Sequence, residues 1–333
     1  MRGTPLVLLA LAAVFVLAAG CTGGDDTPTT LRIVPAGSLL LPMEEVEAGF
    51  EASHPGVDVQ IEGHGSIQCV RQVTDLHRAI DVVVVADEAL IPDMMYRPME
   101  EGDGNYTDSY TTFATNQMVV AYTNQSTYAD EITPENWYEI LARPDVVVGI
   151  SNPMLDAAGY RSLMVTTLAG DYYGNGSIYG AILGDHLRPA PAVSQEGTTT
   201  VITLPEVLKA EGEKVRVRDG SIYLLSLLDA GGVDYAFEYL SVAEGHGLQY
   251  VTLPTEIDLS SAGYADEYEK AVVKLGFQRF GSIGSERIGN PIVYAATVPN
   301  TAPHPELARE FMDYMVAQFS EGHGEGWPTP LPA

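Results

Sequence analysis

The chain has little positive charge and almost no cysteine. Its 333 residues include 17 Lys and Arg against 45 Asp and Glu, which gives a formal net charge of −28. A protein this acidic repels phosphate-rich surfaces, so general electrostatic binding to nucleic acid or to acidic membranes is excluded. Two cysteines, Cys21 and Cys69, cannot build a disulfide framework. We expect Cys69 to be a small buried residue on a helix.

Motifs for metal or covalent chemistry are also missing. The seven histidines never occur as HExxH and the cysteines form no CxxC pair, so no zinc site is expected. There is no GxSxG elbow and no GxxxxGK[ST] loop. A nucleophile at Ser66 or Ser38 would need a base, and His64 is near Ser66, but no third group is indicated to orient the pair. We expect no enzymatic activity, with a secreted serine hydrolase as the alternative.

Only the N-terminus carries a long apolar run. Arg2 precedes an apolar stretch at residues 6–19, which is shorter than the roughly 20 residues that a membrane-spanning helix needs. Residues 1–20 are therefore predicted to be a signal peptide. The small residues before Cys21 resemble a lipobox, which predicts lipid attachment at Cys21 and a lipid-tethered linker at residues 21–30. The mature protein is expected outside the cell, anchored to the outer face of the cell membrane through Cys21.

Three strand-to-helix turns recur along the chain and predict an α/β fold. The turns contain Gly37 and Ser38, then Gly65 and Ser66, then Asp156, Ala157 and Ala158. The first follows an apolar strand at residues 31–34, and the second follows an alternating strand at residues 57–62. Backbone N–H groups at the start of a helix can hold an anion, so each turn is a candidate anion site. For Ser38, the ordinary alternative is that it only caps its helix.

The remaining patterns predict two lobes. Strands are expected at residues 80–86, 116–123, 146–150, 233–239 and 291–298, with helices at 221–229 and 305–319. Residues 174–205 have weak periodicity and are predicted to be irregular. Strands near residues 118–122 and 292–296 are predicted to cross between the lobes. Lobe 1 then comprises residues 31–118 and 292–333, lobe 2 comprises residues 119–291, and the site lies in the cleft between them.

A series of motifs in order along the chain resembles the extracytoplasmic molybdate/tungstate-binding proteins of ABC importers, most closely the archaeal branch. The motifs are AGSL at 36–39, HPGVDV at 54–59, NWYEIL at 136–141, SNP at 151–153, GYRS at 159–162, SVA at 241–243 and PIVY at 291–294. The resemblance implies a two-lobed, type II periplasmic-binding-protein fold with a hinge of two crossing strands. It also implies that oxyanion oxygens accept hydrogen bonds from both lobes.

The resemblance implies specific contacts by matching position. They are Gly37, Ser38 and Ser66 from the first lobe and Asp156, Ala157, Ala158 and Tyr239 from the second. The archaeal proteins also place two carboxylates against the metal centre of the oxyanion. Asp156 matches one, but Ser221 stands at the other position. Either Asp219 or Glu238 substitutes, or Ser221 offers its N–H and hydroxyl to a tetrahedral ligand, which we favour because amides at a helix start bind anions.

The implied function is capture of molybdate or tungstate outside the cell and delivery to ABC permease subunits in the membrane. No cofactor is implied, and no metal apart from the metal centre of the oxyanion. We expect a monomer that touches the membrane only through its lipid anchor. A binding protein for sulfate or phosphate is the alternative within the same class. Molybdate and tungstate are nearly identical in charge and size, so the sequence does not separate them.

Overall fold

The computed structural model describes residues 27–331 except for residue 101 and residues 277–285. The predicted signal peptide, the predicted lipid site Cys21 and most of the predicted linker lie outside the described residues. Among the described residues, none of the helices combines the length and the hydrophobicity of a membrane-spanning segment.

A six-stranded sheet forms the core of the first lobe, in the order β17-β4-β16-β3-β1-β2. Its strands are β1 (Thr29–Pro35), β2 (Val57–Ile61), β3 (Val82–Val85), β4 (Thr111–Thr115), β16 (Val293–Thr297) and β17 (Thr329–Pro330). The helices of this lobe are η1 (Gly37–Leu39), α1 (Leu40–Ser53), α2 (Ser66–Thr74), α3 (Leu90–Met95) and α10 (Pro305–Glu321). Every residue of β3 is buried, as its β-branched run predicts for a central strand.

A five-stranded sheet forms the second lobe, in the order β11-β6-β12-β5-β13. Its strands are β5 (Met118–Tyr122), β6 (Val148–Ser151), β11 (Val215–Arg218), β12 (Tyr235–Tyr239) and β13 (Gln249–Thr252). The helices are α4 (Trp137–Ala142), α5 (Ala157–Tyr172), α6 (Ile178–Ile182), α7 (Ile222–Asp229) and α8 (Leu240–Gly245). Helix α5 is buried over most of its length, so its N-terminal turn is held firmly in place.

The prediction that residues 174–205 are irregular is wrong. This segment contains α6, η2 (Gly184–His186), β7 (Leu187–Arg188), β8 (Ala192–Glu196) and β9 (Thr199–Thr203). Strand β9 pairs with β8 and with the distant β14 (Ala271–Lys274), which pairs with β15 (Glu286–Ile288). All five residues of β8 are exposed, so the strand has no alternating apolar pattern to detect. The other short elements are β10 (Lys209–Ala210), η3 (Ala262–Tyr264) and α9 (Ala265–Tyr268).

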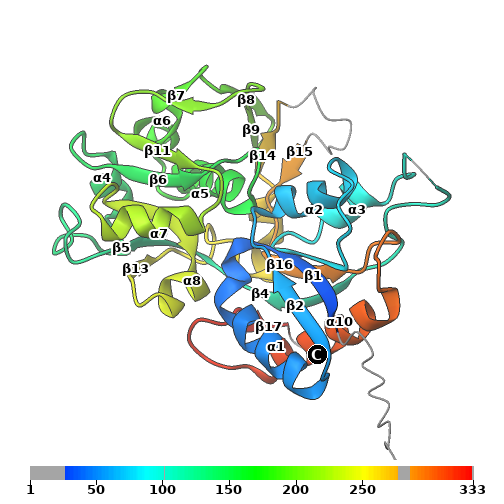
Figure 1. Ribbon diagram of the computed structural model, residues 1–333. Coiled ribbons are helices and arrows are strands. Elements are labelled where there is room, and N and C mark those ends of the chain that lie inside the picture. Colours follow the sequence, from blue (N-terminus) through cyan, green and yellow to red (C-terminus); the bar gives the residue numbers. More distant parts are fainter. Residues whose placement is uncertain (1–26, 101, 277–285, 332–333) are drawn as a thin grey trace, which may run out of the picture.

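The chain leaves the six-stranded sheet before β5 and returns to it at β16, after β14 and β15 of the four-stranded sheet (Figure 1). Strands β4 and β5 are consecutive but lie in different sheets, so the first passage is the link of Asn116 and Gln117. The second passage precedes β16. The two passages meet, because Met118 N donates to Asp258 O at 2.8 Å and Ile292 N donates to Leu259 O at 2.8 Å. The other predicted strands agree with the structure to within two residues at each end.

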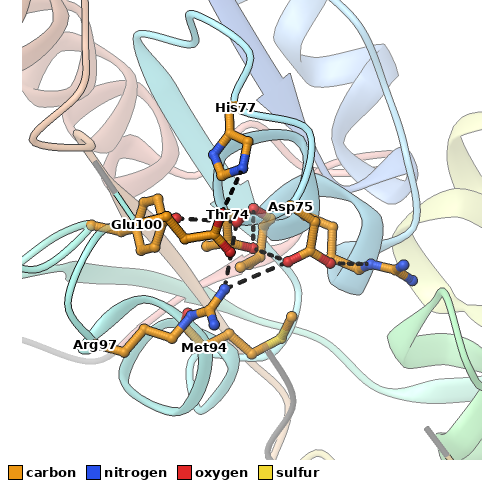
Figure 2. Close-up of polar contacts among 9 residues, drawn as sticks. Thr74, Asp75, His77, Met94, Arg97 and Glu100 are labelled. Carbon is orange, nitrogen blue, oxygen red and sulfur yellow. Dashed lines mark hydrogen bonds and ion pairs between the residues drawn. The ribbon is translucent and has the colours of Figure 1, made fainter. Parts of the chain in front are cut away.

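Polar contacts at Thr74 and Asp75 stabilise the C-terminal end of α2, and Figure 2 shows several of them. Arg71 Nε donates to Asp75 at 2.8 Å, and Arg97 Nη2 lies 3.5 Å from the other oxygen of that carboxylate. The Tyr106 hydroxyl donates to Thr74 O at 3.2 Å. These bonds attach the segment after α3 to α2 and so help to hold the opposite, N-terminal end of α2 in place. Within α2, Cys69 is buried and free of disulfide, as predicted.

Candidate functional site

The starts of three helices converge on the buried carboxylate of Asp156, the N-cap of α5. Ser221 N, at the start of α7, donates to Asp156 Oδ2 at 2.9 Å. Burial raises the pKa of Asp156, while the Ser221 N–H, the Ser151 hydroxyl and the N–H groups of Ala158 and Ser66, all near the carboxylate, act to lower it. Because α2 belongs to the first lobe and α5 and α7 to the second, this negative group lies between the lobes.

The lobes touch through small residues beside Asp156. Gln68 N, in α2, donates to Leu155 O across the gap at 3.2 Å. A Cβ atom added to Gly65 would lie 2.4 Å from Leu155 O and 2.8 Å from Asp156 Cβ. A Cβ atom on Gly37 would lie 3.3 Å from Ile222 Cγ2 of α7. The lobes are therefore closed on one another, and glycine is what lets the backbones approach this closely.

Two buried hydroxyls near this contact each accept a hydrogen bond and keep a proton to donate. Ser66 Oγ accepts from Ala86 N at 3.0 Å. Tyr239 Oη, at the end of β12, accepts from Arg161 Nη1 at 2.7 Å. Neither hydroxyl donates a hydrogen bond to another group in the described part of the chain. Burial raises the pKa of Tyr239 well above its ordinary value, so this hydroxyl stays protonated and remains a donor.

Ser38 and Gly37 have different surroundings from those two hydroxyls. Ser38 lies in η1 and makes no capping bond to α1, so the simple N-cap interpretation does not hold. Its Oγ lies 3.0 Å from Tyr294 Oη, which also accepts from Asn116 Nδ2 at 3.1 Å. Gly37 N donates to His64 O at 2.8 Å. The N–H group of Gly37 therefore already has an acceptor. The absence of a side chain at Gly37 instead allows the close approach of Ile222.

A second buried carboxyl group, Glu238, precedes Tyr239. Its Oε1 accepts from Tyr239 N at 2.9 Å, while Oε2 has no hydrogen-bond partner among the described residues. Asp219 is exposed. It is the other candidate for the second carboxylate that the resemblance implies at position 221. It lines a cavity of about 440 Å³ between the lobes, with His64 and Gln68 of the first lobe and Arg218 of the second. Of the two candidates, only Glu238 lies in the buried region around Ser221.

Glu238 makes the stability of the ligand-free chain depend on pH. Burial raises the pKa of Glu238 from its ordinary 4.5 to about 8. Between these values the unfolded chain loses the proton and the folded chain keeps it, so stability falls as pH rises, by up to about 1.4 kcal/mol per unit. Glu238→Gln should therefore become more stable relative to the original chain as pH increases from 5 to 8, measured by thermal melts.

The matched control for this experiment is Glu135→Gln, at an exposed position in the same lobe. Its melting temperature should follow that of the unaltered chain at every pH. A constant difference between Glu238→Gln and the unaltered chain across this pH range would contradict the buried, protonated state of Glu238.

The structure brings most of the predicted residues to one region and adds others that sequence reasoning missed. Ser66, Asp156, Ala158 and Ser221 meet directly, and Ala157 lies buried in the same turn of α5. Arg161 belongs to the GYRS motif at 159–162, and the sequence predicts no role for it. Because its partners are 75 and 78 residues away, nothing local in the sequence indicates them.

Comparison with known proteins identifies the family. The family model described as bacterial extracellular solute-binding protein matches residues 31–318. The chain belongs to this family. Its members bind solutes, which confirms the prediction that the chain is not an enzyme and removes the hydrolase alternative.

Relatives in this extracellular solute-binding family cover nearly the whole chain. A solute-binding protein of Methanoculleus marisnigri is 40% identical over 97% of this chain and 92% of its own length. The molybdate/tungstate-binding protein WtpA of Pyrococcus abyssi is 39% identical over 98% and 94%. The protein of the same name from Thermococcus kodakarensis is 39% identical over 99% and 94%. The resemblance to molybdate/tungstate-binding proteins found in the sequence is thereby confirmed.

Solved structures show the same fold at much lower identity. The periplasmic molybdate-binding protein of Azotobacter vinelandii aligns with a TM-score of 0.51 at 16% identity, over 86% of this chain and 92% of that one. A periplasmic thiamin-binding protein aligns with a TM-score of 0.52 at 14% identity, over 92% and 84%. These matches confirm the predicted periplasmic-binding-protein fold. At such identities they carry no information about the ligand.

Proposed function

We propose that this solute-binding protein captures molybdate or tungstate in the cleft between its lobes for an ABC importer. The observation that carries the proposal is the convergence of three helix starts on one buried negative group, Asp156, between the lobes. Helix starts favour anions, because their N–H groups are unpaired and the helix dipole is positive there. The names of the Pyrococcus and Thermococcus relatives support molybdate or tungstate as the anion.

In this proposal the oxyanion takes over donors from both lobes. The N–H groups of Ser66, Ala158 and Ser221 and the hydroxyls of Ser66 and Tyr239 each supply a proton. The net charge of −28 opposes any anion at long range, so affinity must come from these short-range bonds. Closure removes water, and hydrogen bonds to an anion are stronger in a dry site of low dielectric. Only the closed form contacts the anion from both sides, so binding favours closure.

Asp156 would distinguish between oxyanions. A doubly charged molybdate has no proton to donate, whereas a phosphate that is still protonated needs an acceptor, which this carboxylate can provide. In the complex, Asp156 would either accept such a proton or contact the metal centre of the oxyanion. A second negative group beside a dianion is costly unless positive charge compensates it.

The cellular setting belongs to the same proposal. We propose that the chain is anchored outside the cell by lipid on Cys21 and presents its ligand to permease subunits as a monomer, without a cofactor. Mass spectrometry of the membrane-associated protein from its native host should show acyl chains on Cys21. Release of an unmodified protein into the medium would contradict the anchor without affecting the ligand assignment.

A thermal melt of the metal-free mature chain tests the ligand. A ligand that binds only the folded state stabilises it by RT ln(1 + [L]/Kd), so molybdate or tungstate at about 100 times Kd should add roughly 2.7 kcal/mol. Sulfate at matched ionic strength serves as the control and should give little shift, while phosphate tests whether Asp156 accepts a proton from the ligand. A shift with sulfate or phosphate alone would favour the alternative oxyanion, and no shift with any of the four would contradict oxyanion binding.

A further inference from the structure

Arg161 joins the two lobes from the second turn of α5. Its side chain is 1% exposed, which is unusual for a guanidinium. Nη1 donates to Ala86 O of the first lobe at 2.7 Å and to Tyr239 Oη of the second lobe at 2.7 Å. The same Ala86 donates its N–H to Ser66 Oγ. One guanidinium therefore connects, directly to Tyr239 and through the backbone of Ala86 to Ser66, the two hydroxyls that keep a proton to donate.

The bonds of Arg161 set the direction in which Tyr239 donates. Because Nη1 donates to Tyr239 Oη, the hydroxyl proton must point away from Arg161. Without Arg161 the hydroxyl would be free to rotate, and its orientation would cost entropy on ligand binding. The guanidinium also holds the carbonyl group of Ala86. The N–H of the same residue donates to Ser66 Oγ and so leaves the Ser66 proton for another acceptor.

Arg161 is also incompletely neutralised. Its Nη2 has no hydrogen-bond partner among the described residues, and it lies 3.9 Å from Asp87 Oδ1. The other oxygen of Asp87 accepts from the Tyr160 hydroxyl at 2.5 Å, so this carboxylate is shared between two groups. A buried cationic N–H without an acceptor is costly. The residual positive charge is available to offset a further negative group in the closed cleft.

We propose that Arg161 is the positioning residue of the cleft: it directs the hydroxyls of Tyr239 and Ser66 toward a divalent tetrahedral oxyanion and holds the lobes closed around it. The inference rests on the proposed function, since the oxyanion is the acceptor that both hydroxyls lack. It differs from a ligand contact, because Arg161 acts through Tyr239 and Ala86. Loss of the guanidinium should mainly speed dissociation, because the bond to Ala86 exists only in the closed form.

The test measures Kd and dissociation rates for molybdate and tungstate with Arg161→Met, Arg161→Lys and Tyr239→Phe, alone and combined. Arg161→Met should weaken binding by about 10- to 100-fold, the usual range for losing hydrogen bonds to a charged group. Arg161→Lys keeps the charge but not the planar fork, so it should recover part of this loss. Arg143→Met removes a partly exposed arginine of the same lobe and is the matched control.

The double variants separate positioning from general loosening of the fold. If Arg161 acts through Tyr239, then Tyr239→Phe should cost much less in the Arg161→Met background than alone. Fully additive losses, or unchanged affinity in Arg161→Met, would overturn the inference. If Arg161→Met does not fold, the double-mutant cycle of Arg161→Lys with Tyr239→Phe tests the inference in its place. Failure of the unaltered chain to bind any oxyanion would overturn the proposed function itself, which is a distinct result.

Discussion

Replacing Gly65 by alanine is expected to weaken oxyanion binding by about 100-fold or more, because a ligand then loses its charge-assisted bonds from one lobe. The added Cβ would lie 2.4 Å from Leu155 O, a backbone atom of the opposite lobe that cannot yield. Gly65 has φ −62°, which alanine adopts freely, so the first lobe itself is unstrained. The substitution should block closure and leave each lobe folded.

Calorimetric titration with molybdate and tungstate, combined with thermal melts of the ligand-free chain, measures this effect. The melting temperature should change little, apart from the small cost of alanine at an N-cap position. Gly176→Ala is the matched control, because a Cβ there meets nothing within 4 Å and should bind normally. Binding by Gly65→Ala at the affinity of the unaltered chain would show that the closed contact between α2 and Leu155 is not the ligand-bound state.

Gly159→Ala is expected to have the opposite signature, a large loss of stability. The added Cβ would lie 2.4 Å from Ser151 O and 2.6 Å from Pro153 N, which are backbone atoms of the same lobe. Here the clash cannot be relieved by opening the cleft, because the first turn of α5 is packed on the end of β6. Overpacking against rigid backbone costs about 3 kcal/mol, which lowers the melting temperature by roughly 4–5 °C for a chain of this size.

Thermal and denaturant unfolding of Gly159→Ala checks this value. The matched control is Gly170→Ala in the same helix, where the nearest atom to the added Cβ is 3.4 Å away. That substitution should be neutral or stabilising by about 0.5–1 kcal/mol, since alanine favours helix over glycine. An unchanged melting temperature for Gly159→Ala would mean that the turn after β6 adjusts, and that it is not the rigid support of the Asp156 carboxylate inferred from these contacts.

Much of the fold follows from local patterns in the sequence. Four successive valines predict that β3 is a buried strand. Asp156, a residue type preferred at the N-cap position, predicts that a helix starts directly after it. Strand β8 shows the limit of this reasoning: it is exposed on both faces, and pairing with β9 is what makes it a strand. No periodicity marks such a segment, since periodicity arises only where one face is buried.

In the candidate site, too, some features follow from the local sequence and others only from the tertiary structure. The sequence alone indicated three helix starts able to bind an anion, because an N-terminal turn exposes its N–H groups whatever surrounds it. Only the tertiary structure placed those starts on one carboxylate, joined Ser38 to Tyr294 across 256 positions, and set Arg161 between Ala86 and Tyr239. Local propensity acts over a few residues, whereas the partner of a buried polar group is decided by the packing of distant segments.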